Sequence, residues 1–167
     1  LLYHIAAERA GLTGNELLLD LYCGAGTIGL SMAAKAREVI GIEIVPEAVE
    51  CARANAAANG IANASFYCGD AGDTEALFAA AENARGKITP DVVILDPPRK
   101  GCEEKLLRFL AARQIKSIVY ISCGPDALAR DAARLVFLGY RMSSVTPVDL
   151  FPRTGHEESV VLLSKND

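Results

Sequence analysis

Short apolar runs alternate along the chain with longer stretches in which apolar residues recur every three or four positions. Apolar runs of about four to eight residues bounded by turn residues indicate buried strands, whereas the longer spacing indicates amphipathic helices. The strands predicted in this way are Leu17–Tyr22, Glu38–Glu43, Ala64–Cys68, Val92–Leu95 and Ser117–Ser122. The helices predicted between and after them are Thr27–Ala36, Pro46–Asn59, Thr74–Asn83, Glu103–Arg113 and Pro125–Leu138.

The end of the chain has a different pattern. Tyr140–Asp149 and Ser159–Ser164 indicate two more strands with no helix between them, and hence an antiparallel hairpin. Repeated strand–helix units predict a parallel sheet with helices on both faces. We therefore expect an α/β fold with a mostly parallel seven-stranded sheet and a carboxyl-terminal antiparallel hairpin, built as one domain over residues 1–167.

The unusual residues follow the predicted strands. They are Asp20–Gly29, Glu43, Asp70, Asp96–Gly101 and Cys123–Pro125. In open α/β sheets, ligands bind beyond the carboxyl ends of the strands, so these segments are expected to form one site.

Residues 20–29, D-L-Y-C-G-A-G-T-I-G, contain the spacing G-x-G-x-x-G between a predicted strand and a predicted helix. Gly24 and Gly26 allow a sharp turn and a close approach to a ligand. The motif suits a dinucleotide such as NAD as well as S-adenosylmethionine, and Glu43 at the end of the next strand can accept hydrogen bonds from the ribose hydroxyls of either.

Two further acids favour S-adenosylmethionine. Asp20 precedes the glycines, where a negative charge disfavours a pyrophosphate and favours an ammonium and a sulfonium. Asp70 follows the third strand, where it is expected to hold the adenine amino group.

Residues 96–101, D-P-P-R-K-G, follow the fourth strand. Two prolines make the backbone rigid, and Asp96 is expected to project from it towards the cofactor. An aromatic after D-P-P would suggest methylation of a base amino group, but Arg99 stands there instead.

Cys123 follows the fifth strand and precedes the helix that begins at Pro125. A helix amino terminus stabilises a thiolate, so Cys123 is a candidate nucleophile, although a buried structural cysteine is the commoner role. The chain has five cysteines and no C-x-x-C pair, which disfavours disulfides and a metal site. The loop between the last two strands carries His156, Glu157 and Glu158.

The formal net charge of −4 counts against RNA binding by this segment alone. The sequence has no apolar run of about 18 residues and no signal-peptide pattern, so we expect a cytoplasmic protein without a membrane partner. The chain starts at Leu1 within a helical pattern, and we expect a domain of a longer protein.

Together these segments resemble the RNA uracil-5-methyltransferases, which make 5-methyluridine in 23S ribosomal RNA and transfer RNA. Residues 96–101 match the family's D-P-P/A-R-x-G segment, and residues 149–158, D-L-F-P-R-T-G-H-E-E, match D-x-F-P-x-T-x-H-x-E. Residues 122–131, S-C-G-P-D-A-L-A-R-D, match S-C-N-P-x-T-L-A-R-D except at Gly124 and Ala127.

The resemblance implies a Rossmann-like class I S-adenosylmethionine-dependent fold. It also implies Cys123 as the nucleophile, Glu158 rather than Glu157 as the base, and an RNA substrate, with 23S ribosomal RNA ahead of transfer RNA. By the same resemblance, residues 1–167 are the catalytic domain and the amino-terminal RNA-binding part is absent from them. The cofactor-site residues that the motifs and the resemblance indicate together are Tyr22, Glu43, Asp70, Asp96, Asp20, Gly24 and Gly26.

Three alternatives remain open at this stage: an RNA cytosine-5-methyltransferase, an NAD-dependent oxidoreductase and a non-catalytic RNA-binding domain. The first usually has a second cysteine in the fourth-strand motif, and here Cys102 comes only after Gly101. Four cations near the site, Arg99, Lys100, Arg130 and Arg153, are candidates for phosphate contacts or for ordinary solvated charges.

Overall fold

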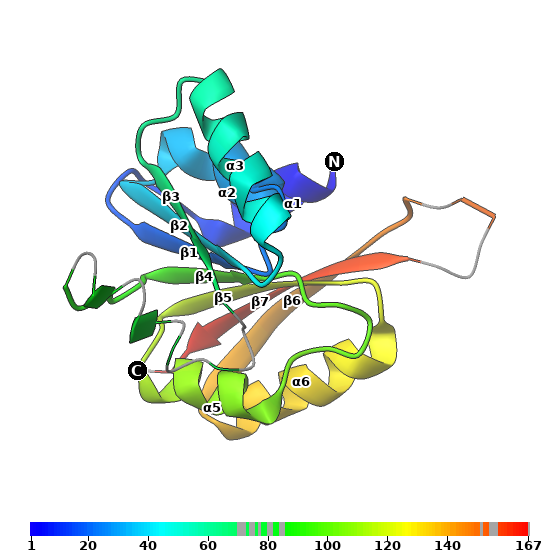
Figure 1. Cartoon of the computed structure of the whole chain (residues 1–167). Helices are drawn as coiled ribbons and strands as arrows, with labels where there is room; N and C mark the ends of the chain where they lie inside the picture. Colours follow the sequence, from blue (N-terminus) through cyan, green and yellow to red (C-terminus); the bar gives the residue numbers. More distant parts are fainter. Residues whose placement is uncertain are drawn as a thin grey trace.

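Seven strands form one twisted sheet in the computed structural model, which describes residues 1–69, 73, 76, 78–79, 82–83, 86–150, 152–153 and 157–166 (Figure 1). The strands are β1 (Leu17–Leu21), β2 (Glu38–Glu43), β3 (Ala64–Cys68), β4 (Val92–Leu95), β5 (Ser117–Ser122), β6 (Tyr140–Val148) and β7 (Glu158–Lys165). Their order is β3-β2-β1-β4-β5-β7-β6, and β7 runs antiparallel to both of its neighbours. This confirms the mostly parallel sheet and the closing hairpin.

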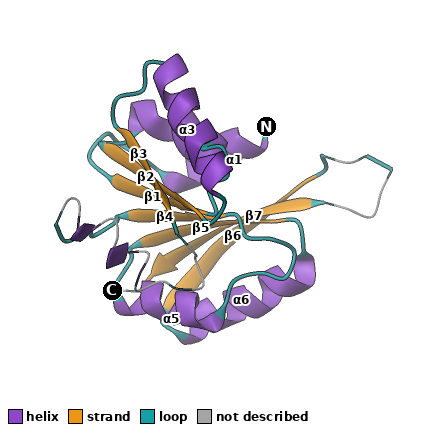
Figure 2. Cartoon of the chain, viewed as in Figure 1, coloured by secondary structure: helices purple, strands orange, loops and turns teal. Residues whose placement is uncertain are grey.

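Helices cover both faces of the sheet (Figure 2). They are α1 (Leu2–Ala10), α2 (Thr27–Met32), α3 (Pro46–Ala58), α5 (Glu104–Ala112) and α6 (Pro125–Phe137), with a 3₁₀ turn over Ala33–Lys35. One face carries α1, α2 and α3, and the other carries α5 and α6. The predicted helix over residues 74–83 lies largely outside the described residues.

The helix predicted over Thr27–Ala36 ends early, because its last turn tightens into the 3₁₀ form. Ala36 has an extended backbone, with φ −111° and ψ 147°. The Asn63 side chain donates hydrogen bonds to the carbonyls of Ala33 and Ala36, at 2.9 and 3.0 Å. Because Asn63 lies far away in the sequence, this end of the helix could not be predicted from local spacing.

The two faces of β1 pack into separate cores. Leu17, Leu19 and Leu21 belong to the core beneath α5 and α6, whereas Leu18 belongs to the core beneath α1 and α2. All five residues of the strand are buried, as expected for a central parallel strand. Burial of each leucine side chain stabilises the fold by roughly 1.5–3 kcal/mol.

The strand directions place the candidate site at one edge of the sheet. The carboxyl ends of β1, β2, β4 and β5 lie together, and the hairpin formed by β6 and β7 extends beyond the same edge (Figure 1). The last strand begins at Glu158, one residue before its predicted start.

Phe66 lies beneath the glycine-rich segment and leaves no room for side chains there. A Cβ atom on Gly41 would lie 2.6 Å from Phe66 Cε1 and 2.9 Å from Cys23 Sγ. A Cβ atom on Gly26 would lie 2.9 Å from Phe66 Cε1, and the φ of +79° at Gly26 also disfavours any side chain. The position of the glycine loop therefore depends on Phe66 in β3.

We expect Gly41→Ala to lower the free energy of unfolding by about 1–3 kcal/mol, because the new methyl group overpacks this contact. Urea denaturation would measure the loss. In a Phe66→Leu background the same change should cost less, because the ring that it meets is gone. An equal cost in both backgrounds would contradict the steric explanation.

Candidate active site

A cleft of about 380 Å³ opens at the carboxyl edge of the sheet. Tyr22 after β1, Glu43 at the end of β2 and Asp96 after β4 all line it. The rest of the lining is Ile44, Pro98, Lys100, Gly101 and Glu103. The structure therefore brings together three of the residues that the sequence nominated from three separate strands.

The loop after β1 has a run of unusual backbone conformations. Tyr22 has a φ of +63°, which is uncommon for a residue with a side chain, and Gly24 has a φ of +52°. Strained conformations of this kind persist only where surrounding contacts enforce them, and they gather at ligand sites.

Glu43 is oriented by main-chain donors on both sides. Gly24 N donates to Glu43 Oε2, and Val45 N donates to Glu43 Oε1, each at 3.0 Å. Each carboxylate oxygen keeps a further lone pair for a ligand. The contact also ties the glycine loop to the end of β2.

Asp20 lies beneath the glycine loop and is fully buried, so it is not part of the cleft wall. Gly29 N donates to its Oδ2 at 2.9 Å, while Oδ1 has no hydrogen-bond partner among the described residues. Burial raises the pKa of Asp20 to about 7 against the effect of the Gly29 hydrogen bond. The carboxyl group therefore supports the loop from below, and the sequence-based idea of direct attraction to a cation stays a prediction.

Asp96 is the mostly buried acid of the cleft. Burial, with a smaller contribution from the negative charge of Glu158, raises the pKa of Asp96 to about 6. Burial also raises the pKa of Glu158, and the positive charge of Arg99 opposes this rise. The site thus holds two carboxyl groups close enough to influence each other, a feature that often marks functional sites.

The pairing of β5 with β7 sets the positions of Cys123 and Glu158. Ser122 pairs with Ser159, so Cys123 and Glu158 come next at the same end of this antiparallel strand pair. The Ser122 hydroxyl donates to Gly124 O at 3.0 Å and accepts from Gly124 N at 3.1 Å. These bonds close a tight loop around the partly exposed Cys123.

Asp131 is a structural residue that the sequence reasoning missed. It is fully buried in α6, and its Oδ2 accepts from Cys102 N and from the Tyr120 hydroxyl, each at 2.7 Å. The sequence signal that could have identified it is the position of this acid on the apolar face of the amphipathic helix α6. Its contacts join the loop after β4, strand β5 and helix α6.

Arg130 belongs to the same network. Its Nε donates to Asp131 Oδ1 at 2.9 Å, and its Nη2 donates to the carbonyl of Lys100 at 2.8 Å. The structure thus gives Arg130 a positioning contact, whereas the sequence suggested either a phosphate contact or a solvated charge.

Both departures from the family pattern face the D-P-P-R-K-G loop. A Cβ atom on Gly124 would lie 3.0 Å from the Arg99 carbonyl oxygen, and a Cβ atom on Gly101 would lie 3.1 Å from Ala127 Cβ. Small residues at 124 and 127 therefore allow the loop after β4 to approach the start of α6 closely.

Some predicted features lie outside the described residues, namely Asp70 and His156. Across the described ranges, no three or more His, Cys, Asp or Glu side chains are grouped so that they could share a metal ion. None of the described helices combines the length and the apolar character that crossing a membrane requires.

A family model described as tRNA (Uracil-5-)-methyltransferase matches residues 5–166. The chain belongs to this family. An uncharacterized RNA methyltransferase of Clostridium acetobutylicum is 48% identical over 166 residues, which cover 99% of this chain and 35% of the relative. One from Enterococcus faecalis is 49% identical over 164 residues, covering 98% and 35%. This family member thus spans about a third of the length of these curated relatives.

Among solved structures, the tRNA (uracil-54, C5)-methyltransferase of Pyrococcus abyssi, in complex with S-adenosyl-L-homocysteine, is similar with a TM-score of 0.77. It is 31% identical, and the match covers 96% of this chain and 37% of that one. A dimethyladenosine transferase of Plasmodium falciparum has a TM-score of 0.71 at 17% identity, covering 99% and 61%, and supports the fold alone.

We expect Asp96→Asn to stabilise the protein at pH 7.5 but not near pH 4. In the unfolded chain the pKa of Asp96 lies near 3.8, and in the folded protein it lies near 6. The folded state therefore binds this proton more tightly, and the contribution of Asp96 to stability falls as the pH rises between these values. Urea denaturation of both proteins across this range would show a growing difference in the free energy of unfolding, whereas a constant difference would contradict the assignment.

Proposed function

We propose that this family member transfers a methyl group from S-adenosylmethionine to C5 of a uridine in RNA, through a covalent bond between Cys123 and uracil C6. The observation that carries the proposal is the pairing of Ser122 with Ser159, from which Cys123 and Glu158 follow at one end of the sheet. Asp96, whose pKa responds to the charge of Glu158, links this pair to the cleft.

The residues of the cleft fit S-adenosylmethionine. A cavity of about 380 Å³ lies within the range of small-molecule sites, which is about 300–1,000 Å³. The Glu43 carboxylate, held by two main-chain N–H groups, suits the ribose hydroxyls, and acids suit a cationic ligand. When bound, this cofactor supplies an electrophilic methyl group on a sulfonium. The Pyrococcus abyssi neighbour holds the demethylated product of the same cofactor.

The chemistry of uracil requires a nucleophile. In the proposed sequence the Cys123 thiolate adds to C6, the electrons of the C5–C6 double bond move onto the O4 side as an enolate, and C5 becomes nucleophilic. C5 then takes the methyl group. Glu158 removes the C5 proton, the double bond re-forms, and the Cys123 thiolate leaves C6.

The remaining residues position the reactants. Asp96 and Tyr22 line the cleft, where Asp96 orients the cofactor and Tyr22 forms part of the wall. Gly24 and Gly26 keep the loop close to the cofactor, Asp20 supports that loop, and Asp70 is assigned to the adenine amino group. The support from Asp20 comes through its hydrogen bond from Gly29 N, whereas the assignment of Asp70 rests on the sequence motif.

The proposed substrate is 23S ribosomal RNA, with transfer RNA as the alternative that the family description and the Pyrococcus abyssi neighbour name. Residues 1–167 act in this scheme as the catalytic domain. The proposed location is the cytoplasm, which suits a chain whose five cysteines are all free thiols.

The decisive test combines the full-length gene product with RNA that contains 5-fluorouridine. Fluorine at C5 cannot leave as a proton, so the Cys123 adduct should accumulate in the presence of S-adenosylmethionine. Denaturing gels would detect the adduct, and mass spectrometry would locate it. Transcripts of 23S ribosomal RNA and of transfer RNA, compared side by side, would identify the substrate.

Cys123→Ala should abolish the adduct, and Cys51→Ala, which changes an exposed cysteine in α3, should leave it intact. Methyl transfer to ordinary RNA without any adduct would reject uracil C5 as the target and make cytosine C5 the next atom to test. Titrations with S-adenosylhomocysteine and NAD would separate a methyltransferase from an oxidoreductase.

We expect Glu158→Gln to slow release of the methylated product by about 10²–10⁴-fold, since it removes a positioned base. Glu157→Gln is the matched control. Glu157 is exposed and faces a separate hollow between α6 and the hairpin, so its loss should change the rate little. Single-turnover kinetics would compare them, and equal effects would reject the assignment of the base.

A further inference from the structure

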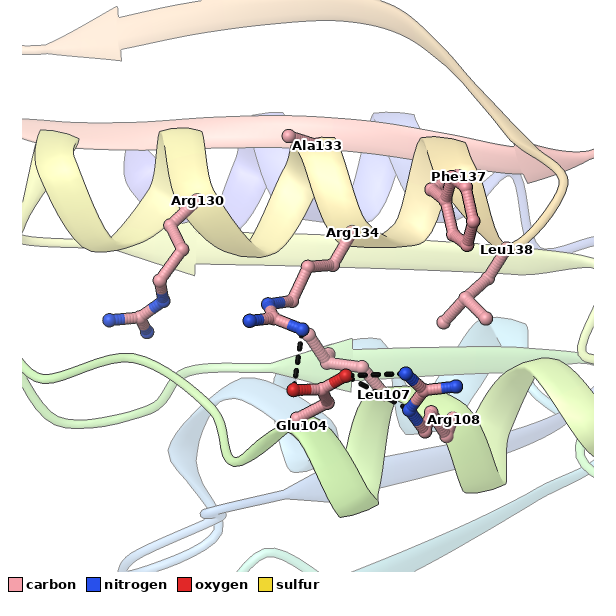
Figure 3. A pocket seen from close by; sticks show the side chains of 8 residues that line it. All are labelled: Glu104, Leu107, Arg108, Arg130, Ala133, Arg134, Phe137 and Leu138. Carbon is pink, nitrogen blue, oxygen red and sulfur yellow. Dashed lines mark hydrogen bonds and ion pairs between the residues drawn. The ribbon is translucent and has the colours of Figure 1, made fainter.

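A further hollow, with a volume of about 410 Å³, lies between α5 and α6, and the active-site scheme does not use it. Its lining combines one acid, three arginines and an exposed aromatic ring. The residues are Glu104, Leu107, Arg108, Arg130, Ala133, Arg134, Phe137 and Leu138 (Figure 3). We call this hollow the α5–α6 groove.

The cations and the aromatic ring form one stripe on α6. Arg130, Arg134 and Phe137 are spaced by four and three residues, which places them on one side of the helix. Figure 3 shows their side chains following one another along the groove, with Arg108 of α5 across from them. Such spacing makes a continuous surface.

One carboxylate holds two of the guanidinium groups. Glu104 Oε1 lies 2.6 Å from Arg108 Nη2, and Glu104 Oε2 lies 2.5 Å from Arg134 Nη1. The side chains of Arg108 and Arg134 are nevertheless 62% and 45% exposed to solvent. Two pre-oriented cations that share one negative charge leave an excess of positive charge at the surface, although the chain as a whole carries −4.

Phe137 adds a contact that charge alone does not explain. It is 87% exposed at the end of α6, next to the arginines. An aromatic ring beside cations is the combination that binds single-stranded nucleic acid, since the cations meet phosphates and the ring stacks on a base.

The groove is continuous with the cleft of the proposed active site. An adjoining hollow shares Lys100 and Gly101 with the cleft, and Glu104, Arg130 and Arg134 with the groove. A strand whose target base enters the cleft can therefore run over Lys100 into the groove.

We propose that the α5–α6 groove binds the backbone of the substrate RNA flanking the target uridine, with Phe137 stacking on an unpaired base. The inference rests on the proposed function for its choice of RNA as the ligand. It adds a binding surface formed by Arg108, Arg134 and Phe137, none of which lines the cleft.

The test measures the affinity of the protein, as its gene encodes it, for a short fluorescein-labelled single-stranded RNA by fluorescence anisotropy across a series of salt concentrations. Arg134→Gln should weaken binding severalfold and lower the slope of log affinity against log salt by about 0.7, the value for one lost phosphate contact on a single strand. Arg37→Gln, which removes the same charge from an exposed residue just before β2, is the control and should change neither quantity.

Glu104→Gln provides a change of opposite sign. Removal of the carboxylate frees Arg108 and Arg134 for phosphates, so RNA affinity and the salt slope should both rise, which loss of folding cannot produce. Phe137→Ala should weaken RNA binding about fivefold or more. The salt slope should stay unchanged, because stacking of a ring on a base releases no counterions.

The proposal is overturned if Arg134→Gln and Phe137→Ala bind RNA as tightly as Arg37→Gln; the groove would then suit a protein partner instead. Adduct formation at Cys123 with 5-fluorouridine RNA in these same variants separates the two claims. A normal adduct with unchanged RNA affinity rejects the groove and leaves the proposed function standing. Absence of RNA binding and of any adduct in the wild-type protein rejects both.

Discussion

The buried carboxylate of Asp131 is the constraint on which the arrangement of the site depends. A charge removed from water is costly unless hydrogen-bond donors surround it. Here the donors are Cys102 N, the Tyr120 hydroxyl and the Arg130 side chain. They belong to the loop after β4, to β5 and to α6, so one acid joins three elements that are separate in the sequence. Arg130 extends the link by holding the carbonyl of Lys100.

A second constraint comes from the sheet itself. The last strand runs antiparallel between β5 and β6, which brings the far end of the chain next to the strand that precedes Cys123. A shift of one residue would turn Glu158 to the opposite face, because side chains alternate along a strand. The apolar residues Val160, Val161 and Leu163 are fully buried and fix that register. Hydrophobic packing thus sets the geometry of a polar site.

The sequence predicted the elements closely because central parallel strands are buried on both faces and leave unbroken apolar runs. The predicted bounds of β2, β3, β4 and β5 agree with the structure. It also nominated Tyr22, Glu43 and Asp96, which line one cleft.

What escaped prediction depends on contacts between distant segments. The early end of α2 depends on Asn63, and the burial of Asp20 depends on how α2 lies over β1. Both small residues that depart from the family pattern, Gly124 and Ala127, lie where the loop after β4 comes within van der Waals reach. Their sizes are therefore coupled to the path of a loop some 25 residues earlier in the sequence. In evolution and in engineering, positions 124 and 127 and the loop after β4 must therefore change together. A larger residue at either position requires a compensating change in that loop.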